Sequence, residues 1–341
     1  MAKKQAQSRQ FEVPQDIVLW GPTQSGKDWL IRAFVKELDR WNIKDDKFRY
    51  ELFGILASGT EPYPVSPEPP LNILPTLEPK DLSYIFRRIP KTSDRTLPQE
   101  HSIIIHNDQG AVMIDSLQDK KTFSQYYFTL MNARNVIIVM GLPAARSGSQ
   151  SPKPTPQSDD HEIDEFEPSL SMTDNQVDAI HSQKARTQDW SKDDYYEFIR
   201  ILLREFEKGP ARNIAVCLTK SDQDSMHGRS WDIFERRYDK RIRSLLEMYR
   251  IDPAQPENNI RKHNIEVFIT SSAGYLYNLT TLKYEKNFIN GVLLNPDDWN
   301  PYNATSPFFW IFEQIEKGRG QKGIFTSSPQ DPTPYPIIVN T

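Results

Sequence analysis

The fold of this chain is decided by residues 16–41, DIVLWGPTQSGKDWLIRAFVKELDRW. Asp16–Trp20 is a short apolar run, which predicts a buried β-strand, and Lys27–Trp41 repeats its apolar residues with helical spacing. Between them, Gly21 to Lys27 matches G-x-x-x-x-G-K, a pattern whose glycines let backbone N–H groups face a phosphate chain. The stretch therefore predicts a strand, a phosphate-binding loop and a helix in succession.

The predicted loop supplies a set of candidate nucleotide contacts. Lys27 would reach the outer phosphates and stabilise the charge that develops on a transferred phosphate. The eighth position of the pattern is usually Ser or Thr, whose hydroxyl binds magnesium, but here it is Asp28. A carboxylate can bind magnesium, yet it adds negative charge beside the phosphates. The alternative is an ordinary glycine-containing turn before a helix. The candidate nucleotide-binding residues here are Gly21, Gln24, Ser25, Gly26, Lys27, Asp28 and Trp29.

The rest of the chain alternates apolar strands with amphipathic helices. This alternation predicts an α/β fold, doubly wound, in which helices cover both faces of a mostly parallel sheet. The first two strands below have no helix between them, so we expect that one pair to be antiparallel. The predicted strands are 83–89, 102–106, 135–140, 213–218 and 265–270, and the predicted helices are 191–208, 231–250 and 306–317.

Composition limits the class of protein. The net charge is -4, so nothing suggests a nucleic-acid partner. The one cysteine, Cys217, excludes an internal disulfide framework and a cysteine-rich metal site, and its strand position predicts a core thiol. No apolar run approaches the roughly 20 residues of a membrane span, and the N-terminus lacks the apolar run of a signal peptide. We expect a cytoplasmic protein without membrane insertion.

Proline-rich and polar stretches predict the domain boundaries. There are 26 prolines and 14 glycines, and the prolines cluster in a few stretches. We expect one domain over 15–317, with flexible ends at 1–14 and 318–341. Within the domain, insertions are expected near 45–80, 146–189 and 275–304.

Four further motifs stand at or beside predicted strands. Thr219-Lys220-Ser221-Asp222 matches [N/T]-K-x-D, and Ser271-Ser272-Ala273-Gly274 looks like an S-A motif. Asn107-Asp108-Gln109-Gly110 stands where D-x-x-G would be, and Pro75-Thr76-Leu77-Glu78 is similar to a switch I segment. Together with the phosphate loop, and in this order, they resemble the Ras-like P-loop GTPase superfamily, in the style of its divergent bacterial members. The resemblance covers about Ile17 to Lys317 and implies a small-GTPase-like P-loop NTPase fold.

The resemblance also implies roles for these residues, with GTP or GDP and Mg²⁺ as cofactors. Asp222, in the motif that begins with Thr219, would accept two hydrogen bonds from guanine that adenine cannot offer, and Lys220 would pack along the base. The backbone at Ser272 and Ala273 would meet the guanine O6 atom. Near the γ-phosphate, the residues that would respond to the bound nucleotide are Thr76, Gln109 and Gly110.

The metal site departs from the family's pattern. Asn107 replaces the aspartate that holds magnesium through a water, and Asp28 replaces the loop hydroxyl. Asp28 could ligate magnesium directly while Asn107 orients a water, or Asp108 could supply the carboxylate after a shift of one residue. A third alternative is that magnesium binding has been lost. The candidate metal ligands are Asp28, Thr76, Asn107 and Asp108.

The catalytic apparatus is also incomplete. Ala111 stands where Ras-like enzymes have a glutamine that orients the attacking water, which predicts slow or partner-stimulated hydrolysis; Gln109 is a candidate substitute. Arg87 and Arg88 are expected to be solvated strand charges, so an activating arginine would come from a protein partner. The alternating charges over Glu235–Arg241 predict a solvated helix face.

Three functions remain open at this point. The first is a guanine-nucleotide switch that works with a protein effector or an activating partner. The second is a pseudo-GTPase scaffold that binds nucleotide without turnover and acts through protein interactions. The third, an ATP-using P-loop kinase, is disfavoured by the motif that ends in Asp222.

Overall fold

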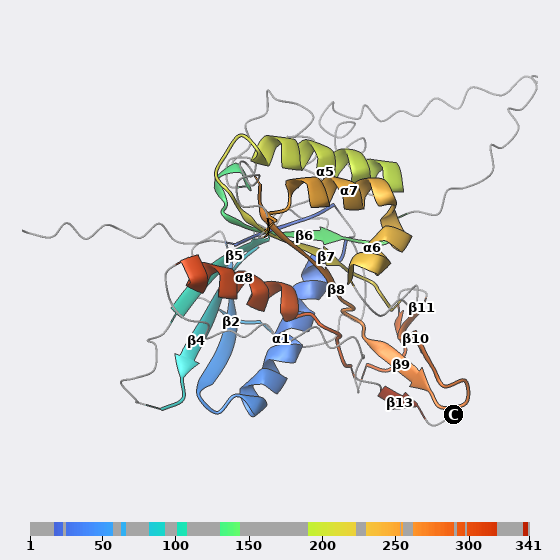
Figure 1. Ribbon diagram of the computed structural model, residues 1–341. Coiled ribbons are helices and arrows are strands. Elements are labelled where there is room, and N and C mark those ends of the chain that lie inside the picture. Colours follow the sequence, from blue (N-terminus) through green and yellow to red (C-terminus); the bar gives the residue numbers. More distant parts are fainter. Residues whose placement is uncertain are drawn as a thin grey trace, which may run out of the picture.

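A computed structural model shows a mixed β-sheet with helices on both faces (Figure 1). The flexible N-terminus expected over 1–14 and the insertion expected over 146–189 lie outside the described residues. The structure describes residues 17–22, 25–56, 63–65, 82–92, 101–107, 130–143, 190–222, 230–252, 254, 262–289, 292–296, 299–318 and 337–339.

The main sheet has eight strands. They are β1 (Ile17–Trp20), β2 (Phe48–Leu56), β3 (Tyr63–Pro64), β4 (Leu82–Pro90), β5 (His101–Asn107), β6 (Asn135–Met140), β7 (Asn213–Leu218) and β8 (Asn264–Ile269). Their order is β3-β2-β4-β5-β1-β6-β7-β8. From β5 to β8 every pairing is parallel, whereas β4 pairs antiparallel with β5, as predicted. The fold class is therefore α/β with a parallel block.

The sheet has more antiparallel pairing than the one pair expected. β2 pairs antiparallel with β4 along its whole length and with β3 at its end. The prolines predict an insertion near 45–80, but the first proline in this range is Pro62. Phe48, Tyr50 and Leu52 are buried at every second position, which is the period of a strand with one face in the core. Their alternation could have predicted β2.

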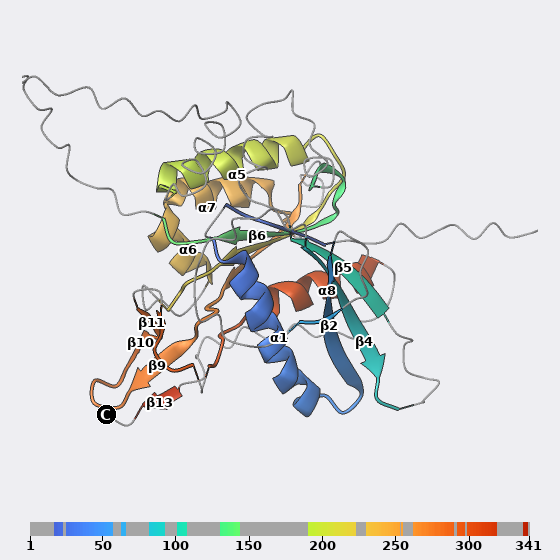
Figure 2. The same cartoon turned by 180° about the vertical axis from the view of Figure 1, so that it is seen from behind.

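Helices cover both faces of this sheet (Figures 1 and 2). α1 (Lys27–Lys44) and α8 (Ser306–Gly318) pack on one face. The other face carries α5 (Lys192–Phe206), α6 (Ser230–Tyr238) and α7 (Lys240–Tyr249). Parallel strands buried in this way carry almost uninterrupted apolar residues, as β1 and β6 do.

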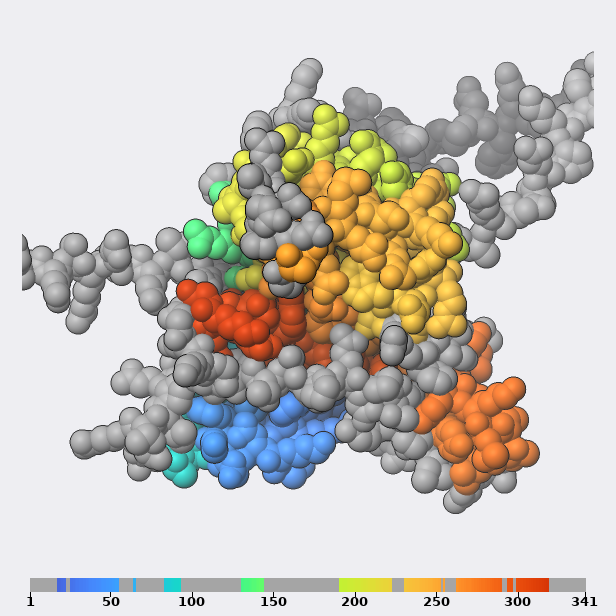
Figure 3. Space-filling view, viewed as in Figure 1, coloured from blue at the N-terminus to red at the C-terminus, as the bar shows by residue number. Residues whose placement is uncertain are grey.

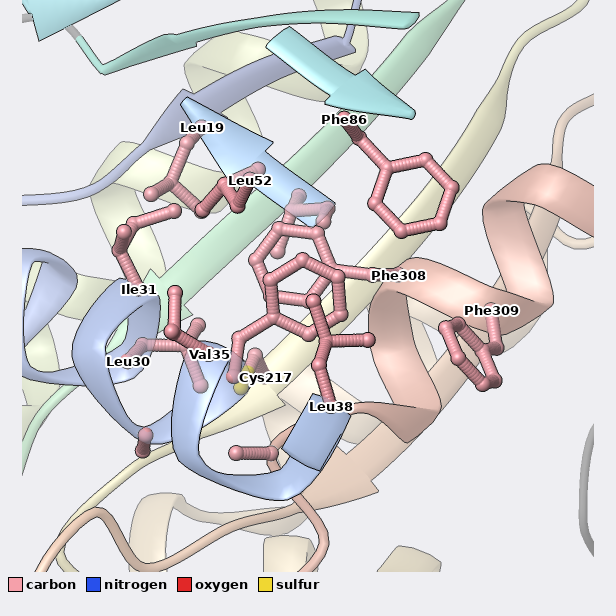
Figure 4. Packing of buried hydrophobic residues seen from close by; sticks show 14 of the residues in the cluster. Leu19, Leu30, Ile31, Val35, Leu38, Leu52, Phe86, Cys217, Phe308 and Phe309 are labelled. Carbon is pink, nitrogen blue, oxygen red and sulfur yellow. The ribbon is translucent and has the colours of Figure 1, made fainter. Parts of the chain in front are cut away.

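Aromatic packing joins α1 to α8 on the first face. Phe34 and Phe308 stack with ring centroids 4.2 Å apart. In Figure 4 the apolar side chains of α1 gather beside Phe308, and Cys217 lies among the same packed residues. Cys217 is fully buried, and burial raises the pKa of its thiol to about 12. The prediction of a core thiol is confirmed.

Two helix predictions had different outcomes. Ser191 caps α5 as predicted, because its side chain accepts from the Asp194 N–H while the Asp194 carboxylate accepts from the Ser191 N–H. The single helix expected over 231–250 is wrong: it is divided into α6 and α7 at Asp239, which has a φ of 131°. The Asp239 carboxylate instead accepts from the Arg241 N–H and caps α7, a local bond that competes with helix continuation.

Arg88 is not the solvated charge that the sequence predicted. Its guanidinium pairs with the Glu316 carboxylate of α8 at 2.7 Å, and both side chains are 1% exposed. Arg88 also lies over the ring of Phe48, 5.0 Å from its centroid. A buried ion pair therefore fastens α8 to the antiparallel half of the sheet.

The insertion expected near 275–304 carries short strands. β9 (Tyr275–Asn278) and β10 (Lys283–Lys286) form an antiparallel hairpin that stands out at the lower right of Figure 3. β11 (Phe288–Ile289) pairs with β12 (Val292–Leu293). β13 (Ile337–Val339), within the tail expected to be flexible, pairs parallel with β9.

Candidate functional site

The carboxyl ends of the parallel strands lie at one edge of the sheet, and the predicted motifs follow them. Leu19 of β1 is in register with Asn107 of β5, and Leu218 of β7 with both Met140 of β6 and Ile269 of β8. The chain leaves β1 toward α1 on one face, whereas α5, the next helix described after β6, covers the other face. Ligands of open α/β sheets bind at such a switch point.

The predicted phosphate loop begins and ends with glycines that no other residue could replace without strain. A Cβ on Gly21 would lie 2.2 Å from the Val139 carbonyl oxygen, so the loop runs directly against β6. Gly26 has a φ of 93°, in the left-handed region that favours glycine, and α1 begins at the next residue. The loop therefore brings the positive end of the α1 dipole to the sheet edge.

Lys27 folds back over this loop. Its ammonium donates to the carbonyl oxygens of Gly21 at 2.6 Å and Pro22 at 3.2 Å. Ser25 is 1% exposed, and among the described residues its hydroxyl has no hydrogen-bond partner. A cation and a buried hydroxyl thus meet at the helix N-terminus, a combination suited to an anion.

Asp28 and Trp29 lie in the first turn of α1. Asp28 is exposed, so its carboxylate is accessible from solvent. Trp29 is half-buried and meets Phe288 edge-to-face with centroids 5.1 Å apart. Phe288 belongs to the insertion, so this insertion borders the loop.

Thr219 connects the T-K-x-D segment to the phosphate loop. Its hydroxyl contacts the carbonyl oxygens of Ser25 and, at 3.1 Å, Met140. The Arg237 guanidinium donates to the Thr219 carbonyl at 2.6 Å, and both residues are buried. The next residue, Lys220, has a φ of 57°. The chain therefore turns sharply after β7 under fixed contacts from both sides.

Arg237 was missed by the sequence prediction, which treated Glu235–Arg241 as a solvated face. Arg237 and Tyr238 are 4% and 0% exposed. They continue the apolar stripe of Ile233 and Phe234 at spacings of three to five residues, so helical periodicity could have placed Arg237 on the buried face.

Asp222 lies beside the S-A segment. It is 1% exposed, and its Oδ1 atom accepts from the Ser271 hydroxyl at 2.5 Å. The same Ser271 oxygen accepts from the Gly274 N–H at 2.8 Å. Tyr275 donates to the Ser221 hydroxyl at 2.6 Å, a second link between the two segments. The sheet edge therefore brings together two of the motifs that the sequence predicted for one site.

The Ser272–Ala273 segment is oriented by the insertion. Trp299 Nε1–H donates to the Ser272 carbonyl at 2.7 Å, and Asn287 donates to the Ala273 carbonyl at 2.8 Å. Since C=O and N–H point in opposite directions in a trans peptide, the Ala273 N–H points away from Trp299. The Ser272 hydroxyl is buried and has no hydrogen-bond partner among the described residues.

The predicted metal and switch residues are only partly placed. Asn107 ends β5 beside β1, two residues before the loop begins at Gly21 in the paired register. No cluster of three or more His, Cys, Asp or Glu residues that could hold a metal occurs in the described part of the chain. The predicted residues Gln24, Thr76, Asp108, Gln109 and Gly110 lie outside the described residues.

One structural feature and two comparisons with known proteins bear on the class of protein. Among the described residues, no helix has the length and apolar character needed to cross a membrane. No protein-family model matches the sequence, and no curated protein matches it.

Proposed function

We propose that this protein is a guanine-nucleotide-binding switch of the Ras-like P-loop GTPase type, with slow or partner-stimulated hydrolysis. The observation that carries the proposal is the meeting of three motifs at one sheet edge. Thr219 bonds to Ser25 of the phosphate loop, and Ser271 of the S-A segment bonds to Asp222. Segments far apart in the sequence are thus held close together, which supports one nucleotide touching all of them.

The phosphate side of the proposed site fits a polyphosphate. The α1 N-terminus, the Lys27 ammonium and the buried Ser25 hydroxyl all favour an anion. When a nucleotide binds, Lys27 would exchange its two carbonyl contacts for phosphate oxygens. Magnesium would supply further neutralisation of the phosphate charge, and Asp28 and Asn107 are the residues that would hold it.

The base side of the proposed site fits guanine. The buried Asp222 carboxylate would accept the N1–H and 2-amino hydrogens, while the Ala273 N–H would donate to O6. Adenine presents one acceptor at the N1 position and lacks the 2-amino group, so it would donate neither hydrogen bond to the carboxylate. Leaving a buried polar group unsatisfied costs about 1–3 kcal/mol, which supports selection of guanine.

Hydrolysis in the proposed switch depends on positioning. Lys27 and the loop amides would stabilise the charge on the γ-phosphate as water attacks in line. Ala111 cannot orient that water, so turnover would be slow until a protein partner supplies the missing group. Thr76 and the segment from Asn107 to Gly110 would change position with nucleotide state.

A second candidate is the pseudo-GTPase scaffold, which keeps the nucleotide and lacks turnover. Three departures from the family's pattern favour it. Asp28 brings a carboxylate to the phosphates, Asn107 removes one from the metal site, and Ala111 replaces the glutamine that orients the attacking water. Both functions require guanine binding, so they separate only at the magnesium and turnover steps.

The test is nucleotide affinity by calorimetry, for GTP, GDP and ATP, with and without magnesium. We expect guanine selectivity in the wild type. Asp222→Asn should reduce GTP affinity at least tenfold and favour XTP, because an amide donates to the C2 carbonyl of xanthine. Asp232→Asn, at an aspartate 62% exposed, is the matched control and should change nothing. Equal binding of GTP and ATP, or none, would contradict the proposal.

A nucleotide affinity that is the same with and without magnesium, together with no phosphate release, would support the scaffold. Magnesium-dependent phosphate release would select the switch.

A further inference from the structure

One segment of the insertion bridges the S-A loop and helix α1. We call residues 287–289, 292–296 and 299–305 the latch segment. On the S-A side, Asn287 and Trp299 donate to the two carbonyls described above, at 2.8 and 2.7 Å. The backbones of Ser271 and Tyr302 exchange two hydrogen bonds, of 2.8 and 3.0 Å. Three consecutive residues of the S-A loop are therefore held by this segment.

The same segment is bound to α1. The Glu37 carboxylate accepts from the Thr305 N–H at 2.7 Å, and Trp41 Nε1–H donates to the Thr305 hydroxyl at 3.3 Å. Arg40 donates to the Asn300 side chain. These three residues lie in the C-terminal half of α1, whose N-terminus carries the phosphate loop. The latch segment therefore connects the S-A loop to the helix that follows the phosphate loop.

Several of the residues that make these contacts are buried. Asn287 is 0% exposed, Trp299 3% and Glu37 7%. A Cβ on Gly274 would lie 1.9 Å from the Asn300 carbonyl oxygen, so the S-A loop and the latch segment are in direct backbone contact. Burial raises the pKa of Glu37 despite its bond from Thr305. Buried polar contacts of this kind fix one geometry, because any displacement leaves a buried group unpaired.

We propose that the latch segment sets how long a guanine nucleotide stays bound, with Trp299 and Asn287 as positioning residues. This inference rests on the proposed function. A nucleotide held at Lys27 by its phosphates and at Ala273 by its base requires a fixed spacing between α1 and the S-A loop. Residues that touch no ligand atom, but hold this spacing, control the rate at which the base leaves.

The variant that tests this is Trp299→Phe, which keeps an aromatic ring and removes one hydrogen bond. We expect fluorescent GDP to dissociate about fivefold faster, the effect of losing one ordinary buried hydrogen bond. The affinity for inorganic pyrophosphate, which would contact only the phosphate loop, should stay unchanged. Trp310→Phe is the matched control, since Trp310 is half-buried on α8 and packs on Phe268 of β8.

A second variant and a second measurement protect the test against simple misfolding. Trp41→Phe acts at the α1 end of the latch segment on a half-buried residue and should also speed GDP release. Hydrogen exchange of nucleotide-free protein should show faster exchange of residues 271–274 in Trp299→Phe than in Trp310→Phe. This readout needs no ligand, so it separates failure of the latch from failure of the proposed function.

Each result of the Trp299→Phe experiment either supports or overturns the inference. Faster GDP release with unchanged pyrophosphate affinity supports the inference. GDP release or exchange equal to that of Trp310→Phe overturns it, as does an equal loss of pyrophosphate affinity, which would indicate general destabilisation. Wild-type protein without guanine binding would overturn the proposed function and the control of residence time with it, and hydrogen exchange would still report whether Trp299 holds the loop.

Discussion

The hydroxyl of Thr219 contacts the backbone carbonyl of Ser25, a residue 194 positions earlier in the chain. This contact is buried at both ends and joins the carboxyl end of β7 to the loop that follows β1. Since β6 lies between these two strands, the contact crosses above it, and the same hydroxyl also bonds to Met140 at the end of β6. Three neighbouring strand ends are thus fixed by one side chain.

Removing the Thr219 hydroxyl should loosen the phosphate loop. Thr219→Val keeps the shape but leaves the Ser25 carbonyl without this donor, so we expect a loss of about 1–3 kcal/mol in the free energy of unfolding and weaker GDP binding. Thr219→Ser retains the hydroxyl and should be close to wild type. Urea unfolding and GDP calorimetry measure both effects. Equal stability of the Val and Ser variants would show that the hydrogen bonds contribute nothing.

Arg237 should matter far more than its neighbour in sequence. Arg237→Met removes a buried guanidinium that donates to the Thr219 carbonyl, so about 2 kcal/mol of stability should be lost. Arg236 is exposed on the same helix, and Arg236→Met should change stability by no more than about 0.5 kcal/mol. Chemical denaturation of the pair is sufficient. Similar losses in both variants would restore the solvated-face interpretation.

The buried pair Arg88–Glu316 should show strong non-additivity. Either Arg88→Met or Glu316→Leu removes one partner of a buried ion pair and should cost about 3–5 kcal/mol, whereas the double variant should recover most of that loss. A double-mutant cycle by urea unfolding measures the coupling. Additive losses would mean that the two charges do not depend on each other.

Stability should fall in mild acid because of His263. Its side chain is fully buried, and burial, with Arg212 nearby, lowers its pKa from 6.5 to about 4. Below pH 6.5 the His263 side chain binds a proton in the unfolded chain but not in the folded chain. The free energy of unfolding therefore declines between about pH 6.5 and 4, and this residue leaves it unchanged above pH 6.5. The expected loss from this residue is about 2 kcal/mol between pH 7 and 5.

His263→Asn is the comparison, because its amide oxygen can still accept from the Arg212 N–H, as Nδ1 does at 3.3 Å. The variant should lose less stability than wild type over the same pH interval. Parallel unfolding curves at neutral and acidic pH would show that another group causes the acid sensitivity.

The parts predictable from sequence were those governed by short-range patterns. The apolar runs of β1 and β6 and the spacing of α5 each determine an element by local periodicity. The cap at Ser191 also follows from adjacent residues. The break at Asp239 could not be predicted in this way, because apolar residues with helical spacing occur on both sides of it.

The candidate site was predictable as a set of positions but not as a set of contacts. The motifs gave Ser25, Thr219, Asp222 and Ser272, and the sheet order explains why they meet. Trp299 and Asn287 carry no motif, because their role depends on where the insertion folds back. The burial of Arg88 likewise could not be predicted, because it depends on Glu316 of α8, which is 228 residues away in the sequence.

The central position of β1 has a consequence for how the chain folds. Ile17 is in register with Ile105 of β5 and Asn135 of β6, so both neighbours of the first strand come from much later in the sequence. Closing such long loops costs chain entropy before the strand contacts that compensate for it have formed. Because this cost comes first, we expect the chain to fold slowly. During synthesis, β1 leaves the ribosome before either neighbouring strand has been made, so its backbone hydrogen-bonding groups have no strand to pair with. The nascent chain should therefore depend most on chaperones until β6 has left the ribosome.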